Sequence, residues 1–196
     1  MEQQQIRSFI AIELPAELKS ALLSLQDEFR SAGFNFVKWV APEGIHLTLK
    51  FLGSVPQSKI PEIVAGMSRA CSGIAPFRLE TSELGVFPNI RRPGVFWLGV
   101  AGDLEQVCTL QKCIDDELKP LGFVPEKRAF TPHLTLARLR ETASLQNRKD
   151  FGALVSAAHF CSKNSIEVNG VNLMRSQLMP TGAVYSRLNE VKLKGG

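Results

Sequence analysis

Two copies of one tetrapeptide carry the side chains of this sequence that are best suited to acid–base chemistry. His46-Leu47-Thr48-Leu49 recurs as His133-Leu134-Thr135-Leu136, displaced by 87 residues (133 − 46). Alternate side chains of an extended strand point to opposite faces. Each copy therefore presents an imidazole and a hydroxyl on one face, about 7 Å apart along the strand, and leucines on the other.

Phosphodiester hydrolysis is the reaction that two such motifs could perform together. One group must activate water and another must protonate the leaving oxygen, and histidine suits both roles because its ordinary pKa is about 6.5. Thr48 and Thr135 could donate hydrogen bonds to the nonbridging phosphate oxygens. A single His-x-Thr on a strand is usually the polar side of a half-buried sheet. The identical recurrence favours the catalytic interpretation of His46 and His133.

The residues that precede each copy repeat as well. An apolar run at residues 8–12 precedes the first copy, and a similar run at residues 95–100 precedes the second. Phe9 maps to Phe96 at the same displacement of 87 residues (96 − 9). Both runs predict buried strands. The repeat therefore extends well beyond the tetrapeptide.

An amphipathic helix is expected after each of these strands. Apolar residues at spacings of three and four predict one buried face in the first helix: Leu18, Ala21, Leu22, Leu25 and Phe29. The second helix has a similar stripe, with Asp103 as the expected N-cap: Leu104, Val107, Cys108, Leu110, Ile114 and Leu118. Further helices are predicted at residues 58–71 and 145–158, and further strands at 77–87, 165–178 and 183–193.

This order of elements predicts an α+β fold built from two lobes related by a pseudo-twofold axis. Each lobe would be a mainly antiparallel sheet with outer helices, and the lobes would face each other across a central cleft. The equivalent strands that carry His46 and His133 would lie on opposite walls. No linker rich in Pro, Gly or Ser separates the halves, so residues 1–196 are expected to form a single domain.

The composition places few limits on function. The 196 residues are 44% hydrophobic and 21% charged, as in an ordinary globular protein. No apolar run approaches the roughly 20 residues of a membrane span, and no export signal is evident, so a cytoplasmic protein is expected. The net charge of +4 permits an RNA partner without showing one.

Neither a metal nor another cofactor is expected from the sequence. The chain has four cysteines, which form no Cys-x-x-Cys pair and are expected to be reduced core thiols. It has three histidines, and His159 lacks any partner motif. No Cys/His cluster has the spacing of zinc ligands. A metal-dependent hydrolase remains an alternative if carboxylates complete a site.

The doubled motif resembles the two signatures of the two-histidine (2H) phosphoesterase superfamily. Within it, the chain is similar over nearly its whole length to the bacterial and archaeal RNA 2′,3′-cyclic phosphodiesterases, historically called 2′-5′ RNA ligases. The similar segments surround both motifs and reach the closing hairpin: residues 7–12, Trp39, residues 46–53, Phe87-Pro88, residues 91–97, residues 130–138, residues 173–178, Gly182 and Tyr185.

That resemblance implies a substrate, a direction and a set of roles. Family members open a terminal 2′,3′-cyclic phosphate to a 2′-phosphate, and they are associated with reversible, ATP-independent 2′-5′ joining of RNA. By resemblance, His46 would be the proton donor and His133 the proton acceptor, although pseudo-symmetry leaves the two hard to distinguish. RNA ends with a cyclic phosphate, tRNA fragments among them, would be the partner. A monomer is expected because both lobes belong to one chain.

Residues near the motifs are weaker candidates. Phe87 could stack on a terminal base or be a core aromatic, and Arg92, like Arg91, could contact RNA phosphates or lie in a solvated turn. Phe51 is expected in the core beside Leu47 and Leu49. Arg138 is expected on the strand face opposite His133 unless the strand bulges, and Lys50 and Tyr185 are expected outside the catalytic set.

The sequence leaves three other functions open. The chain could act on another 2H substrate, such as a cyclic phosphate on an ADP-ribose derivative or a 2′-5′ oligoadenylate. It could also bind RNA ends without turnover, although binding alone would not need two proton-transfer groups. A metal-dependent hydrolase would lose its activity in a chelator.

Overall fold

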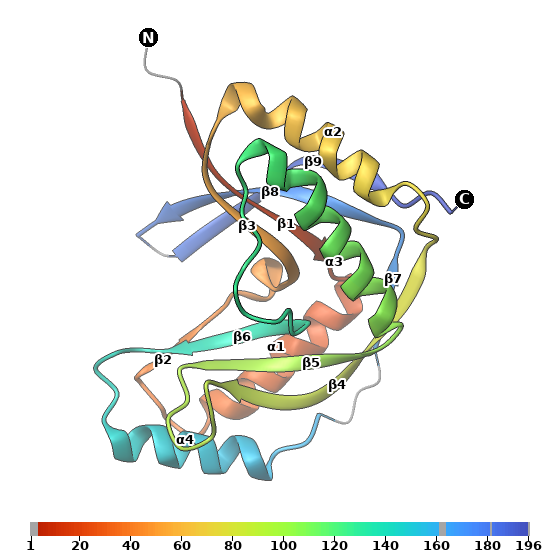
Figure 1. Ribbon diagram of the computed structural model, residues 1–196. Helices are drawn as coiled ribbons and strands as arrows, with labels where there is room; N and C mark the ends of the chain where they lie inside the picture. Colours follow the sequence, from red (N-terminus) through yellow and green to blue (C-terminus); the bar gives the residue numbers. More distant parts are fainter. Residues whose placement is uncertain (1–3, 161–163, 181, 196) are drawn as a thin grey trace.

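The computed structural model describes residues 4–160, 164–180 and 182–195. Nine strands form one sheet in this part of the chain, and four α-helices pack on it (Figure 1). The strands are β1 (Gln5–Glu13), β2 (Val37–Trp39), β3 (His46–Pro56), β4 (Phe77–Phe87), β5 (Val95–Gly102), β6 (His133–Leu139), β7 (Ser165–Val168), β8 (Gly170–Met179) and β9 (Gly182–Lys192). The helices are α1 (Ala16–Arg30), α2 (Ile60–Cys71), α3 (Leu104–Leu118) and α4 (Leu145–Ala157).

The strands form two antiparallel half-sheets that meet at the strands carrying the two motifs. The order is β7-β4-β5-β6-β3-β1-β8-β9, and β2 pairs with β6. The β6–β3 contact joins the half that holds β4 and β5 to the half that holds β1 and β8. The predicted α+β fold with two antiparallel lobes is confirmed, and the structure adds that the lobes join edge to edge. The strands that carry His46 and His133, expected on opposite walls of a cleft, are instead neighbours that pair at the junction.

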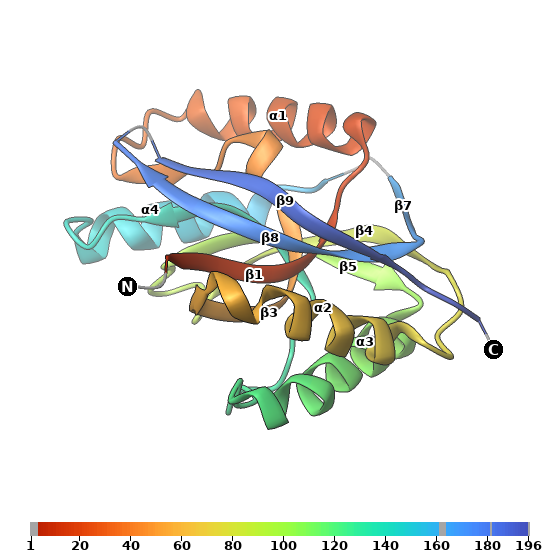
Figure 2. The ribbon, with the colours of Figure 1, turned by 90° about the horizontal axis from the view of Figure 1, so that it is seen from above.

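The two sequence repeats exchange strands. β4, from the first half of the chain, pairs with β5, and β8, from the second half, pairs with β1. In Figure 2, β8 and β9 lie alongside β1 although they are far from it in sequence. Neither half of the chain could complete its half-sheet alone, which explains why no linker separates the repeats.

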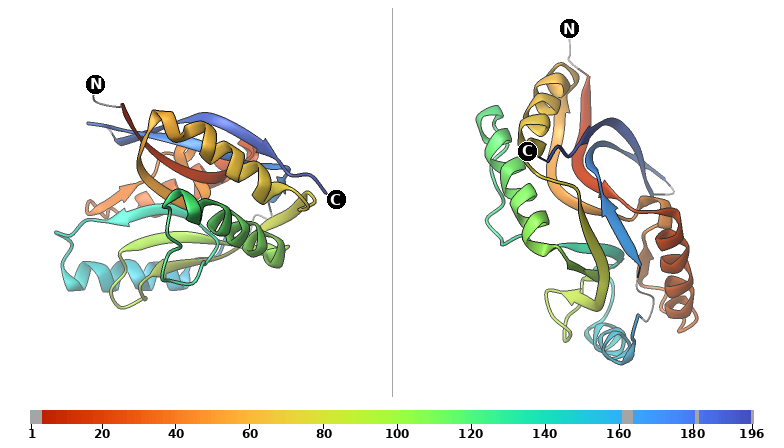
Figure 3. Two further views of the ribbon diagram at one scale, coloured as in Figure 1. Left: turned by 45° about the horizontal axis from the view of Figure 1, so that its top comes forward. Right: turned by 90° about the vertical axis from the view of Figure 1, so that its right-hand side faces the viewer.

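Two helices cover each half-sheet (Figures 1 and 3). On one, α1 and α4 pack beneath β5: the Phe29 ring lies 4.7 Å from Phe96 and 6.1 Å from Phe151. On the other, α2 and α3 lie side by side, where Arg69 pairs with Glu117 at 2.6 Å. Each half-sheet thus has one helix from each repeat. This matches the predicted outer helices.

The predicted apolar faces are largely buried. In α1, the residues Leu18, Leu22, Leu25 and Phe29 are at most 4% exposed. In α3, the four buried positions are Val107, Leu110, Ile114 and Leu118. Leu104 and Cys108, predicted to share that face, lie at the surface instead. The helix turns them away from the sheet because the apolar stripe is narrower than predicted.

Several predicted boundaries are corrected by the structure. The helix expected from residue 58 begins at Ile60, after a 3₁₀ turn at Gln57–Lys59. The strand expected at residues 165–178 is two strands, β7 and β8. Asp103 makes no side-chain cap on α3, because its Oδ2 accepts a hydrogen bond from the backbone N–H of Arg78 at 2.9 Å.

The equivalence of Phe9 and Phe96 is wrong by one residue. Ile10 pairs with Lys50 in one half, and Phe96 pairs with Ala137 in the other. Since Lys50 and Ala137 occupy the same place in the repeat, Ile10 corresponds to Phe96, a displacement of 86 residues (96 − 10). Both are 0% exposed in the core. Phe9 instead lies on the opposite face of the sheet, with Ala11 and Met174.

The cysteines of the described residues differ in their exposure. Cys71 is buried, Cys113 is half-buried and Cys108 is exposed, so the expectation of core thiols fails for Cys108. Cys161 lies outside the described residues. Among those residues, no helix combines the length and apolar character that crossing a membrane requires.

Candidate active site

The two motifs meet at one pair of leucines. Leu47 of β3 and Leu134 of β6 are antiparallel partners, both 0% exposed in the core. Continuing this register by one residue sets His46 across from Thr135 and Thr48 across from His133. Neighbouring side chains of a strand alternate between faces. All four polar side chains therefore project from the face opposite the two leucines, as the spacing within each motif predicts.

Each histidine is held by the same backbone hydrogen bond. The Nδ1–H of His46 donates to the carbonyl oxygen of Gly44 at 2.8 Å. The Nδ1–H of His133 donates to the carbonyl oxygen of Thr131 at 2.7 Å. A carbonyl oxygen can only accept, so Nδ1 must carry the hydrogen in both rings. In the neutral tautomer this leaves Nε2 with a free lone pair, available to a substrate or a water molecule.

His46 lies in an aromatic pocket. Its ring stacks on Phe9 with centroids 4.5 Å apart and planes inclined by 24°, and the Tyr185 ring meets it edge-on at 5.2 Å. Burial lowers the pKa of His46 to about 4, and this outweighs the hydrogen bond to Gly44 and the carboxylate of Glu13, which both raise it. With this pKa, His46 is neutral at pH 7 in the free protein.

Tyr185, expected outside the catalytic set, lies against His46 in the structure. The tyrosine reaches this position from β9, where its Cα partner is Ser176 of β8. A Cβ atom at position 44 would lie 3.1 Å from the Tyr185 ring, so Gly44 makes room for the aromatic contact. Only the pairing of β9 with β8, and of β8 with β1, brings this residue to the site, and the local sequence carries no sign of it.

His133 has its own aromatic neighbours. The ring of Phe87 meets it edge-on at 5.0 Å, and Trp97 lies at 6.2 Å. Phe87 and Trp97 also contact each other at 5.1 Å. A Cβ atom at Gly85 would fall 2.2 Å from the indole of Trp97, so only glycine allows this packing. Phe87 is half-buried at the site, which places it beside the predicted base and not in the distant core.

A β-bulge after each threonine changes which residues face the site. Thr48 pairs with Ala11 and Lys50 with Ile10, so Leu49 is the extra residue in β3. In β6 the extra residue is Leu136, between the partners of Trp97 and Phe96. The bulge reverses the alternation beyond it. Lys50 and Ala137 consequently turn into the core.

Phe51 and Arg138 are the residues that these bulges turn onto the site face. Phe51, predicted to be in the core, is 59% exposed, with its ring 6.3 Å from Phe9. Arg138 is exposed between the buried residues Ala137 and Leu139. Arg138 was expected to share the face of His133 only if the strand bulged, and β6 has this bulge. Beyond the bulge, position 50 faces the core, where an apolar residue would be expected. The residue there is a lysine, so the sequence gave no usable sign of the bulge.

Each bulge lies over a buried polar side chain of the helix below it. Gln26 of α1 is 0% exposed and donates from Nε2 to the carbonyl oxygens of Leu136 at 2.9 Å and Val40 at 2.8 Å. At the other bulge, Lys50 is 4% exposed and forms an ion pair with Asp115 of α3. These interactions fix the backbone where it departs from regular strand geometry.

Cations gather along the far end of β6. Lys38 of β2 is the direct cross-strand partner of Arg138, and both side chains are exposed. Like charges in directly opposed positions destabilise a sheet, and neither residue forms an ion pair with a described carboxylate. An anion bound between them would remove the repulsion. Arg92 is also exposed, in the β4–β5 loop, but no ring or polar contact among the described residues joins its side chain to the histidines.

The side chains gathered here suit proton transfer to and from a bound phosphate ester. Two imidazoles offer Nε2 atoms, two threonine hydroxyls flank them, and cations lie beside them on the same face. Within residues 4–160, 164–180 and 182–195, no group of three or more His, Cys, Asp or Glu side chains could hold a metal ion.

Comparison with known sequences gives one family. The family described as LigT like Phosphoesterase matches residues 12–97 and again residues 98–185, in agreement with the internal repeat. The RNA 2′,3′-cyclic phosphodiesterase of Methanothermobacter thermautotrophicus is 35% identical, and the alignment covers 96% of this chain and all of that protein. The protein of the same name from Thermus thermophilus is 33% identical over 97% of this chain and 91% of its own length.

Solved structures have the same fold. TT0787 of Thermus thermophilus superimposes with a TM-score of 0.78 at 30% sequence identity, covering 97% of this chain and 99% of that one. LigT of Escherichia coli in its apo form gives a TM-score of 0.73 at 22% identity, covering 97% of this chain and 98% of that one. The second similarity concerns the fold alone.

Proposed function

The chain belongs to the LigT-like phosphoesterase family, and from this premise we propose that it hydrolyses RNA 2′,3′-cyclic phosphate ends to 2′-phosphates. One observation carries the proposal: His46, Thr48, His133 and Thr135 share one face around the Leu47–Leu134 pair. Relatives named for this activity are 35% and 33% identical over nearly the whole chain. The enzyme would be a hydrolase acting on phosphodiester bonds.

The reaction would be one in-line displacement with two proton transfers. A water molecule loses a proton to Nε2 of His133 while its oxygen attacks phosphorus. The bond from phosphorus to the 3′ oxygen breaks, and His46 gives that oxygen a proton from Nε2. The hydroxyls of Thr48 and Thr135 donate to the nonbridging oxygens, whose negative charge must be stabilised during the transfer. The product retains its phosphate on the 2′ oxygen.

The lowered pKa of His46 adds a condition to this assignment. A residue with a pKa of about 4 carries almost no proton at neutral pH, so His46 must gain one before it can donate. The cyclic phosphate is an anion, and a negative charge close to an imidazole raises its pKa. We therefore expect His46 to take up its proton as the substrate binds. The reverse assignment, with His46 as base, is the alternative that pseudo-symmetry allows.

A sulfur substitution separates the two assignments. A thiol has a pKa of about 8.5, so a 3′ bridging sulfur can leave without being protonated. If His46 is the acid, His46→Ala should hydrolyse the 3′-thio cyclic substrate at a rate close to that of the wild type, and His133→Ala should remain inactive. Rescue of His133→Ala instead would reverse the roles.

Neighbouring side chains are proposed to hold the rest of the RNA end. Phe87, packed on His133, and Phe51, exposed on the same face as His46, would stack on bases, because stacking tolerates any sequence. The exposed cations Arg92, Arg138 and Lys38 would contact phosphates. Such contacts would add affinity without reading sequence.

The remaining expectations concern cellular context. Both histidines come from one chain, which supports a monomer. A single domain over residues 1–196 and a cytoplasmic location are proposed from the sequence. The relatives' name supports RNA as the partner; tRNA fragments and reversible 2′-5′ joining follow from the family resemblance and are proposed on that basis. The proposed chemistry uses side chains of this chain and no cofactor.

The test uses a short RNA that ends in a 2′,3′-cyclic phosphate, incubated with purified protein and a chelator. The expected product is the 2′-phosphate, absent when either His46→Ala or His133→Ala replaces the wild type. A 3′-phosphate product would refute the proposed direction. Binding of the RNA without turnover by the wild type would favour an end-binding protein, and turnover of an ADP-ribose cyclic phosphate alone would favour another 2H activity.

A further inference from the structure

We propose that RNA upstream of the cyclic phosphate binds in a cationic groove between the β4–β5 loop and α4, where Arg91 and Lys149 contact its phosphates. The inference rests on the proposed function for the identity of the ligand, and it adds a second binding site outside the catalytic face. The chemical class recognised is a single-stranded phosphodiester backbone.

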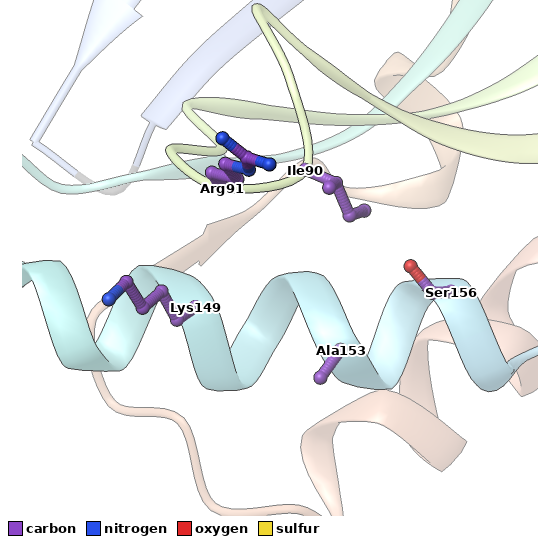
Figure 4. Close-up of a pocket in the computed structure, with 5 residues that line it drawn as sticks. All are labelled: Ile90, Arg91, Lys149, Ala153 and Ser156. Atoms are coloured by element: carbon purple, nitrogen blue, oxygen red, sulfur yellow. The ribbon is translucent and has the colours of Figure 1, made fainter.

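The groove has two walls of different origin. It has a volume of about 510 Å³ and is lined by Ile90, Arg91, Lys149, Ala153 and Ser156. Figure 4 shows Ile90 and Arg91 on the loop and the other three residues along α4. Spacings of four and three residues put the helical members on one face. Small side chains at Ala153 and Ser156 leave room, and the Ser156 hydroxyl can donate to a phosphate oxygen.

The loop wall is fixed in place by polar contacts and close packing. Arg148 of α4 donates to the carbonyl oxygens of Pro93 and, at 2.9 Å, of Arg140. The Asn89 side chain accepts from the backbone N–H groups of Arg91 and Arg92, both at 3.1 Å. A Cβ atom at Gly152 would lie 2.2 Å from the carbonyl oxygen of Ile90, so helix and loop touch there. These contacts hold the loop against the helix.

The charge on this surface is not neutralised by the protein. Arg91 and Lys149 are exposed, and neither forms an ion pair with a described carboxylate. Arg148 makes its hydrogen bonds to carbonyl oxygens and adds a further positive charge beside them. Asp150, the nearest acid in sequence, accepts from Gln146 at 2.7 Å. A phosphodiester would supply the anions that these cations lack, and it would release counterions on binding.

The groove begins close to the reaction site. Phe87, whose ring lies 5.0 Å from that of His133, is the last residue of β4 before the loop. Arg91 follows four residues later, so their Cα atoms are at most about 14 Å apart. A single strand of RNA, whose phosphates recur about every 3.4 Å or more along its axis, covers this distance within a few nucleotides. A cyclic mononucleotide is too short to do so.

The experiment compares substrates of different length. We would measure hydrolysis of a cyclic mononucleotide and of a ten-nucleotide RNA with the same cyclic end, using the wild type and the double variant Arg91→Ala/Lys149→Ala. The ratio of the two kcat/KM values, RNA over mononucleotide, should fall roughly 10-fold in the variant, mostly through KM. Two lost phosphate contacts should also reduce the slope of log affinity against log salt by about 1.4.

A matched control removes the same charge from the opposite half of the molecule. Lys112→Ala/Lys119→Ala alters exposed lysines in and just after α3, and it should leave the ratio unchanged. An equal fall in both double variants would mean a net-charge effect and would overturn the proposal, as would an unchanged ratio in Arg91→Ala/Lys149→Ala. If the wild type hydrolyses neither substrate, the proposed function fails. In that case, fluorescence anisotropy with the ten-nucleotide RNA tests the groove separately, by comparing the RNA affinity of the wild type with that of the two double variants.

Discussion

Leu47 and Leu134, the second residues of the two motifs, form the single residue pair that joins β3 to β6 in the described chain. Cross-strand partners share a face, so two buried leucines orient four polar side chains toward the opposite side. Each histidine then lies across from the threonine of the other motif. The two histidine motifs are thus brought together by the junction of the half-sheets.

The buried neutral state of His46 predicts acid sensitivity. In the unfolded chain its pKa is about 6.5, and in the folded protein it is about 4. Between pH 6.5 and pH 4, His46 is protonated in the unfolded chain but neutral in the folded protein. The free energy of unfolding should therefore fall as the pH is lowered through this range, and the effect of His46 should level off below pH 4. The difference corresponds to about 3 kcal/mol. Urea unfolding of the wild type and of His46→Gln across this range measures it.

His159→Gln is the matched control, because His159 is exposed. It should retain the wild-type dependence between pH 6.5 and pH 4, whereas His46→Gln should flatten it. Identical slopes for His46→Gln and the wild type would mean that His46 titrates normally in the folded protein.

Tyr185, which lies on β9, is predicted to keep the pKa of His46 low. Its ring covers the imidazole edge-on at 5.2 Å and also contacts Phe9 at 5.1 Å. Tyr185→Ala should admit water and raise the pKa of His46 from about 4 toward 6.5, because desolvation is the main cause of the lowered pKa. Imidazole resonances followed by NMR during a pH titration report this directly. Tyr185→Phe keeps the ring, and a raised pKa there would assign the effect to the hydroxyl instead.

Much of the fold could be predicted because the repeat is strong and local. Strand β4 is found at the predicted residues, and α1 and α4 lie close to them, since apolar periodicity at three and four residues specifies a helix face. The two histidines and two threonines could be brought together because alternation along a strand is a local property. The polar faces of equivalent strands then needed only to be near each other.

The remaining site residues depend on long-range geometry that no short sequence pattern encodes. Phe51 and Arg138 reach the site face because of bulges that the pairing partners reveal. Tyr185 reaches it because β8 pairs with β1 and β9 pairs with β8. A bulge changes a strand's register without leaving any gap in its sequence. The one-residue error at Phe9 and Phe96 has a different origin, because both halves carry the same bulge. The segment from Ile10 to its partner Lys50 is one residue shorter (50 − 10 = 40) than the segment from Phe96 to Ala137 (137 − 96 = 41).

Gln26 is predicted to act on the site through the bulge above it. Gln26→Leu leaves the carbonyl oxygens of Leu136 and Val40 without their side-chain donor, which should cost about 1–3 kcal/mol of unfolding free energy. It should also lower kcat/KM for RNA, since Arg138 lies two residues after the bulge. A double-mutant cycle with Arg138→Ala tests this coupling.

In that cycle the two losses in kcat/KM should be less than additive. Additive losses would mean that Gln26 supports the fold without positioning Arg138. Ser24→Ala, on the exposed side of the same helix, serves as the control and should change neither stability nor kcat/KM.

Phe51 offers the sharpest separation of function from stability. Its side chain is 59% exposed, so Phe51→Ala should change the free energy of unfolding by less than about 0.5 kcal/mol. Loss of a stacked base costs about 1–3 kcal/mol, so kcat/KM for RNA should fall at least about 5-fold. Phe51→Tyr keeps the ring and should retain activity, and Val124→Ala, 78% exposed, should be neutral. If Phe51→Ala matches the wild type in RNA turnover, the exposed ring is a surface feature and another residue holds the base.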